Sequence, residues 1–184
     1  MTDRRDDERT RFGLRARVGA GVVLAAAVVV VVLLVAAPSD RPTTAADAAA
    51  LANRGPTARG PAVDARHPAL LDAAVQGVAF PAYRREFGWR ATGRRSDRLG
   101  GHATATVFYE HRGGRIAYTI VAGDALKLPG DATALRHGGI SLSTFAAGAA
   151  VTWVRRGHTC VLTGARLAVL LRFATWRGAG AIVF

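Results

Sequence analysis

The stretch HATATVFYEHRGGRIAYTIVAG, residues 102–123, decides how the C-terminal part of this chain is expected to fold. Two runs rich in β-branched and aromatic residues flank the pair Gly113-Gly114, the pattern of a β-hairpin with a two-residue glycine loop. Pairing across that loop gives the opposed pairs Tyr109–Tyr118, Val107–Ile120 and Ala105–Ala122. One face of the hairpin is therefore apolar throughout and is expected to pack against a core.

The other face of this hairpin is mostly polar. It carries Thr104, Thr106, Glu110 and Thr119, with Phe108 as the exception. Antiparallel sheets commonly pack on one face and contact water on the other. The pattern thus predicts an antiparallel sheet that is covered on one side.

The same pattern of apolar residues around a glycine-containing turn predicts a second hairpin. It is expected to turn at Arg156-Gly157, which sets Trp153 opposite Cys160 and Val151 opposite Leu162. Further strands are predicted at 89–95, 140–146 and 149–155, a turn at 96–101, and a loop at 124–139 around Pro129.

Two helices are expected to flank the sheet. Apolar residues at helical spacing predict an N-terminal helix over 67–77 (Leu70, Leu71, Ala74, Val75 and, beyond it, Val78) and a C-terminal one over 166–176 (Leu167, Leu170, Leu171 and Ala174). The predicted fold class is α+β: an antiparallel sheet of five or six strands with a helix at each end, in a domain over 66–184.

Ahead of this domain lies an uncharged segment, VGAGVVLAAAVVVVVLLVAA, residues 18–37. As a helix it would reach about 30 Å, the thickness of a bilayer's hydrocarbon core. It therefore predicts a single transmembrane helix, and a cleaved signal peptide is the alternative. The Arg residues of the tail 1–17 predict a cytoplasmic N-terminus and an extracytoplasmic C-terminal domain. Residues 38–65, rich in Ala, Pro, Thr and Gly, are expected to be a flexible linker in which 45–53 forms a helical turn or two.

Composition restricts the classes of partner. The formal charge of +12 comes from 24 Arg and the single Lys127, dispersed among acids, so the sequence predicts no nucleic-acid binding. Residues 1–17 contribute +2 and residues 38–184 contribute +10. The surplus after the apolar segment is either a solvated surface or a basic face for anionic lipid or cell-wall polymer.

The sequence contains few residues that could form a catalytic or metal-binding site. His67, His102, His111 and His137 have no second ligand at metal-binding spacing. His158 and Cys160 share a strand face and would form half a metal site or a nucleophile–base pair, but Trp153 opposite Cys160 favours a small buried core residue. Ser39, Ser96, Ser141 and Ser143 lie in no nucleophile pattern. We expect no enzyme, with no catalytic residue, cofactor or metal ligand.

Three stretches carry a family resemblance: FGWRATGRRSDRLGGHATATVFYEHRGGRIAYTIVAG (87–123), VTWVRRGHTCVLTG (151–164) and LAVLLRFATW (167–176). Together they resemble the extracytoplasmic domain of membrane-bound anti-sigma factors from high-GC bacteria, over roughly residues 78–176. The resemblance implies a cytoplasmic zinc-binding domain that holds a sigma factor, one membrane helix, and an outer sensing domain. Residues 1–17 contain neither the His nor the Cys-x-x-Cys pair of that zinc domain, so no zinc ligand can be named.

Three functions follow as expectations. The first is a membrane-anchored extracytoplasmic regulatory or sensory module that contacts another envelope or signalling protein or a ligand. The second is an anti-sigma factor whose zinc-binding domain precedes Met1 because the start codon was assigned too late. The third is an anchored protein that binds anionic lipid or wall polymer. We favour the first, at the cell membrane with a single pass.

Overall fold

The computed structural model describes residues 42–184, which form one compact unit from Pro42 to Phe184. The predicted tail 1–17, the predicted membrane-spanning segment 18–37 and the first residues of the predicted linker lie outside the described residues. Within 42–184 no helix is both long and apolar enough to cross a bilayer.

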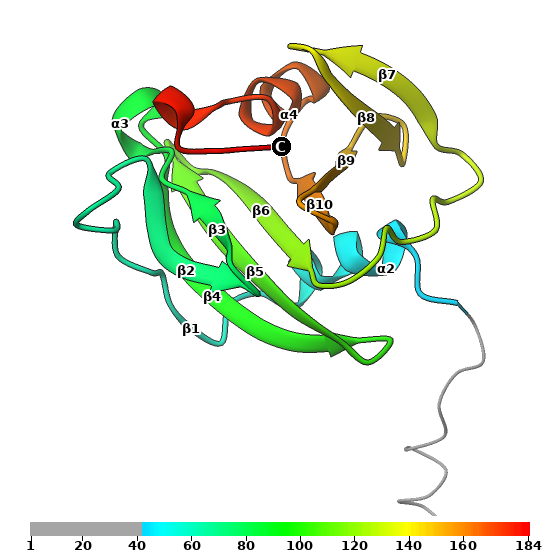
Figure 1. The fold of residues 1–184 in the computed structure, drawn as a ribbon, viewed down its shortest axis with the longest axis horizontal. Coiled ribbons are helices and arrows are strands. Elements are labelled where there is room, and N and C mark those ends of the chain that lie inside the picture. The colour runs from blue at the N-terminus through cyan, green and yellow to red at the C-terminus, as the bar shows by residue number, and fades with distance from the viewer. Residues whose placement is uncertain (1–41) are drawn as a thin grey trace, which may run out of the picture. The chain divides into compact units, whose positions relative to one another are not determined.

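The described domain is dominated by one antiparallel sheet of eight strands, with few helices (Figure 1). In chain order its strands are β1 (Ala58–Arg59), β4 (Arg90–Leu99), β5 (His102–His111), β6 (Gly114–Val121), β7 (Thr133–His137), β8 (Ile140–Phe145), β9 (Ala150–Arg155) and β10 (His158–Thr163). Their order across the sheet is β1-β4-β5-β6-β10-β9-β8-β7, so the two predicted hairpins meet at its centre through β6 and β10. The predicted large antiparallel sheet is confirmed, with more strands than the five or six expected.

The remaining elements cover this sheet. They are α2 (Ala45–Ala50), the 3-10 turn η1 (Leu51–Arg54), the separate hairpin β2 (Leu70–Val75) and β3 (Val78–Pro81), α3 (Arg84–Phe87), α4 (Leu167–Ala174) and the 3-10 turn η2 (Gly178–Gly180). The predicted C-terminal helix corresponds to α4.

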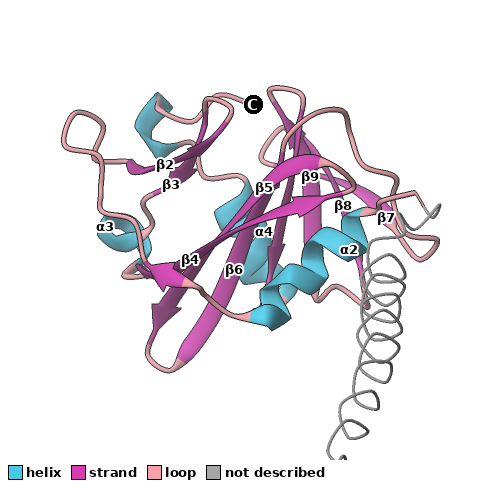
Figure 2. Cartoon of the chain, turned by 90° about the horizontal axis from the view of Figure 1, so that it is seen from below, coloured by secondary structure: helices cyan, strands magenta, loops and turns pink. Residues whose placement is uncertain are grey.

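The two faces of the sheet hold two separate apolar clusters. The inner face, defined here as the one bearing Val107, Tyr118 and Trp153, packs against the β2–β3 hairpin and α4. The outer face is the one bearing Val121 and Val161, and α2 packs on it. Figure 2 shows α2 in front of the strands and α4 behind them. The sheet is thus buried on both sides near its centre.

The register of the second hairpin is confirmed: Trp153 pairs with Cys160 and Val151 with Leu162, around the turn Arg156-Gly157. In the first hairpin the turn is Arg112-Gly113, with both residues at positive φ, and Tyr109 pairs with Ile116. The predicted turn, one residue later, is therefore wrong. Moving a turn by one residue shifts the register by two, so each side chain keeps its face and the apolar face was predicted correctly.

The expectation of a wet outer face is wrong. Thr104, Thr106 and Thr119 are at most 3% exposed, and Phe108 is also buried. The hydroxyl oxygens of Thr106 and Thr119 are 2.8 Å apart in a hydrogen bond, which satisfies both groups away from water. Threonine is acceptable on a buried sheet face when its hydroxyl finds such a partner.

The helix predicted over 67–77 is also wrong. Residues 70–75 form β2, and Gln76-Gly77 at positive φ turns the chain back into β3, with Val75 opposite Val78. The apolar spacing of this segment fits both structures, and the left-handed turn at Gln76-Gly77 selects the hairpin.

Residues 42–65 belong to the folded domain, and their assignment as a flexible linker is a further correction. Thr44 caps α2 in a reciprocal box with Asp47, and Ala45 and Ala48 are 0% exposed. Alanine has no large side chain to signal burial, yet its small size lets the helix lie close against the sheet.

This placement of α2 can be tested by substitution. We expect Ala48→Gln to lower the free energy of unfolding by about 1–3 kcal/mol, because the longer side chain has no room between helix and sheet. Ala50→Gln is the matched control, since Ala50 is exposed and its substitution should stay within about 0.5 kcal/mol of wild type. Urea unfolding of the full chain measures both, and equal effects would mean that α2 is not docked.

Candidate functional site

Of the residues singled out from the sequence, His158 and Cys160 lie on the same strand, β10. Cys160 is 0% exposed on the inner face, and burial raises the pKa of its thiol to about 11. A buried neutral thiol lacks the thiolate that a nucleophile or metal ligand requires. His158 lies two residues away on the same strand, with its Nδ1 3.0 Å from the Arg156 carbonyl oxygen. Among residues 42–184 no group of three His, Cys, Asp or Glu side chains is placed to share a metal ion.

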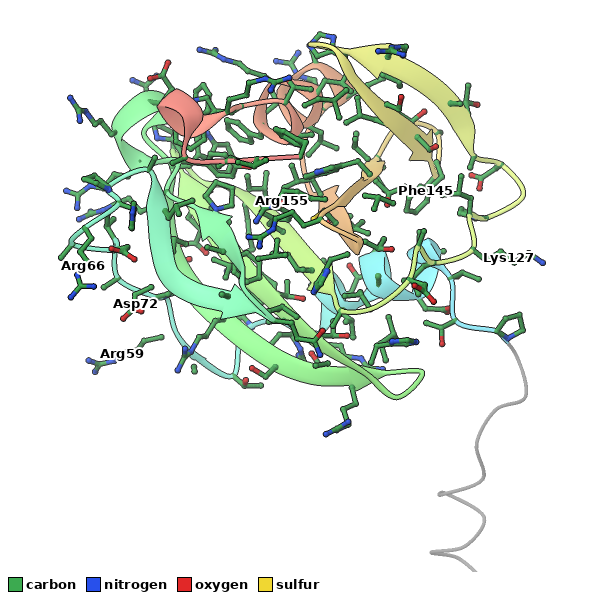
Figure 3. The ribbon with its side chains drawn as sticks, viewed as in Figure 1. Arg59, Arg66, Asp72, Lys127, Phe145 and Arg155 are labelled. Carbon is green, nitrogen blue, oxygen red and sulfur yellow. The ribbon has the colours of Figure 1, made fainter. Side chains whose placement is uncertain are left out.

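The most unusual group of the inner face is Arg155 at the end of β9. Its side chain points inward toward β3 (Figure 3), and the residue is 4% exposed. Its guanidinium donates to the Ala79 carbonyl oxygen and, at 3.3 Å, to the Tyr118 hydroxyl. A buried charge is costly unless it is hydrogen-bonded, so these contacts fix the position of β3.

A second arginine also holds the β2–β3 hairpin against the large sheet. Arg156 donates to the Gly77 carbonyl oxygen at 3.2 Å, and Tyr109 donates to the Pro81 carbonyl oxygen at 2.8 Å. The β2–β3 hairpin is therefore held over the inner face by side chains of the large sheet. On the same face of the sheet, the ring nitrogens Trp153 Nε1 and His158 Nε2 are buried without a hydrogen-bond partner within the described chain.

The outer face carries an open groove of about 450 Å³ over β7–β10, called here the outer groove. Its lining combines apolar groups with hydroxyls and includes Leu126, Leu128, Arg136, Ser141, Ser143, Val154 and Thr159. Leu128 and Val154 are 44% and 48% exposed, so large apolar side chains contact solvent here. A concave site with apolar walls and a few polar groups is the usual form of a binding site.

One wall of the outer groove is the connecting loop, residues 122–132 between β6 and β7. Leu126 and Leu128 line the groove, and the backbone N–H of Leu126 donates to Thr159 Oγ1 at 2.9 Å. Between these two leucines, the Lys127 carbonyl oxygen accepts the N–H of Ala45 at 3.0 Å, while Figure 3 shows the Lys127 side chain pointing away from the sheet.

The same loop residues therefore contact the groove and the start of α2. Leu126 also packs against the apolar cluster that contains Ala45 and Ala48. A ligand that displaces Leu126 or Leu128 would move the carbonyl to which the first residue of α2 is bonded. The connecting loop thus links the lining of the outer groove to the start of α2.

Sequence reasoning missed both features, although signals for both were present. The predicted register already placed Arg155 on the face of Trp153, where a charge is out of place. In the loop, Leu126 and Leu128 alternate with Lys127, the spacing of an extended segment that packs one side.

Comparisons of the chain with protein-family models, with curated proteins and with solved structures give no match. We therefore infer function from the chain's own residues and geometry.

Burial of Cys160 predicts a pH dependence of stability. In the unfolded chain the thiol titrates near pH 9, whereas in the folded chain its pKa is about 11, so the unfolded state loses its proton first. The stabilisation is fully present below pH 9 and should fall by about 1 kcal/mol between pH 9 and 10. The three buried tyrosines, whose ordinary pKa is 10.0, add a similar decrease in this window, so the contribution of the thiol is the difference between wild type and Cys160→Ala. Urea unfolding at pH 8, 9 and 10 should show a smaller decrease for Cys160→Ala, and parallel curves would contradict the prediction.

The link between loop and helix predicts a local effect of Thr159→Val. Loss of the Oγ1 acceptor leaves the Leu126 N–H unpaired and loosens the connecting loop, at a local cost of about 1–3 kcal/mol. We expect amide hydrogen exchange of Ala45 and Ala48 to become several-fold faster in the full chain. Thr163→Val, at the other end of the same strand and face, is the control and should leave these amides unchanged. Unchanged exchange in Thr159→Val would mean that the loop does not hold α2.

Proposed function

We propose that this chain is a membrane-anchored regulatory or sensory protein whose domain 42–184 lies outside the cytoplasmic membrane. It acts by noncovalent contact with a protein or ligand at the outer groove. The observation that carries the proposal is the connecting loop, in which Leu126 and Leu128 line the groove and the Lys127 carbonyl holds the first residue of α2.

The order of elements along the chain supports a relay. Residues 38–44 alone lie between the apolar segment 18–37 and α2. A change in the docking of α2 therefore acts on the part of the chain closest in sequence to the proposed anchor. Ligands shift such equilibria only when they bind one arrangement better, and the exposed Leu128 and Val154 offer the contacts for that difference.

The resemblance to the outer domain of membrane-bound anti-sigma factors agrees with this role. The resembling stretches include β9, β10 and α4, which form part of the groove floor and the inner core. In this proposal the chain keeps the anchor and the outer module of that plan, and its output is a contact with another envelope or signalling protein.

The proposed topology is tested by thiol labelling in intact bacterial cells. In a Cys160→Ala background, Asp72→Cys places the thiol at an exposed position of β2, and Arg156→Cys serves as a second reporter. Both should react with a membrane-impermeant maleimide before lysis. Thr10→Cys, in the tail, is the matched control and should react only after lysis. Protection of both domain thiols in intact cells, with labelling after lysis, would overturn the proposed location.

A further inference from the structure

The outer groove ends at β7, the last strand on its side of the sheet. Figure 1 shows β7 at the rim of the domain, paired with β8. A strand at the edge of a sheet presents a row of backbone N–H and C=O groups to which another extended segment can bond. The register with β8 decides which groups of β7 are turned outward.

That register runs from Thr133 opposite Thr144 to His137 opposite Ile140, around the two-residue turn Gly138-Gly139. The residues that flank a two-residue turn form a hydrogen-bonded pair, and bonded pairs then alternate along the ladder. Thr133, Leu135 and His137 therefore bond inward to β8. The backbone N–H and C=O groups of Ala134 and Arg136 face the open edge.

The side chains of β7 indicate which residues of an added strand would fit beside it. Ala134 and Arg136 are exposed on the outer face and line the outer groove, whereas Leu135 packs against the inner core. Small Ala134 leaves room beside it for a large apolar side chain that reaches the groove. Leu135 favours an apolar neighbour on the inner face, and Arg136 favours a carboxylate.

The opposite edge of the sheet offers no comparable site. Its β1 spans only Ala58–Arg59, and the neighbouring edge of β4 carries Arg94 and Arg98 together with the ion pair between Arg95 and Asp97. Charged side chains and very short strands are the usual protection of a sheet edge against further pairing. β7 has one charged side chain, and it lies at the rim of an apolar groove.

We propose that β7 binds an extended peptide segment of a partner protein by strand addition. In the antiparallel orientation the segment reads acidic–apolar–apolar, with these residues opposite Arg136, Leu135 and Ala134. The inference rests on the proposed function, because it names the class of partner that acts at the outer groove. The +10 surplus of residues 38–184 favours an acidic segment over a basic one.

The test uses a fluorescein-labelled probe peptide, Ser-Thr-Glu-Val-Leu-Thr-Ser, and the full chain purified in a mild detergent. Fluorescence anisotropy measures binding, and amide hydrogen exchange reports protection of Ala134 and Arg136. Saturable binding with protection of these two amides is the expected result. The same probe carrying N-methyl groups on the glutamate and the second apolar residue should not bind, because it lacks both edge-facing donors.

Two protein variants separate strand addition from nonspecific adhesion. Ala134→Pro removes a backbone N–H that faces away from β8, so the fold should be kept. The affinity for the probe peptide should fall about tenfold. Ala134→Val retains the N–H and is the control. Arg136→Glu should reverse the preference between the glutamate probe and its lysine counterpart. The Arg136→Glu variant and the N-methylated probe do not depend on the proline variant, so they test the proposal even if Ala134→Pro does not fold.

Binding that is indifferent to N-methylation and to the charge reversal would overturn the inference. A dimer of the full chain that Ala134→Pro dissociates would assign the edge to a second copy of the chain and would likewise overturn it. Thiol labelling at residue 72 does not depend on β7. Labelling as predicted without probe binding would therefore refute the peptide site and leave the proposed function standing.

Discussion

The burial of the large sheet on both faces is the constraint on which the rest of this domain depends. The central strands β5, β6 and β10 are apolar on the inner face and only moderately polar on the outer one, and neither face is left to water there. The β2–β3 hairpin and α4 cover the inner face, and α2 covers the outer face. Because α2 is built from alanines, it can lie close against Val121 and Val161 on this face. The hydroxyls of Thr106 and Thr119 are buried on the same face and hydrogen-bond to each other.

Arg155 adds a polar element to this packing. A buried guanidinium is tolerated when its N–H groups have acceptors, and here the acceptors belong to the hairpin that must be held in place. The contact ties β9 to a two-stranded unit that shares no strand pairing with the large sheet. The same burial raises the pKa of the Cys160 thiol, so this side chain packs in the core in its neutral form.

Much of the sheet was predictable from the sequence because alternation with period two survives small errors of register. The turn of the first hairpin was placed one residue late, and the apolar face was still correct. Two kinds of element were not predictable in this way. The segment 70–81 has apolar spacing that fits helix and strand alike, and only the left-handed turn at Gln76-Gly77 decides between them. Helix α2 lacks large apolar residues, so its burial depends on the tertiary surface it meets. The outer groove likewise arises from residues of the connecting loop and of β7–β10 that only the fold brings together.

We propose that the outer groove and α2 are energetically coupled through the connecting loop. A double-mutant cycle between Leu128→Ala, in the groove, and Ala48→Gly, in α2, measures this coupling directly by urea unfolding of the full chain. Independent sites give additive changes in the free energy of unfolding within about 0.3–0.5 kcal/mol. We expect a coupling free energy clearly above that limit. Additive effects of the two substitutions would show that the outer groove and α2 are not coupled.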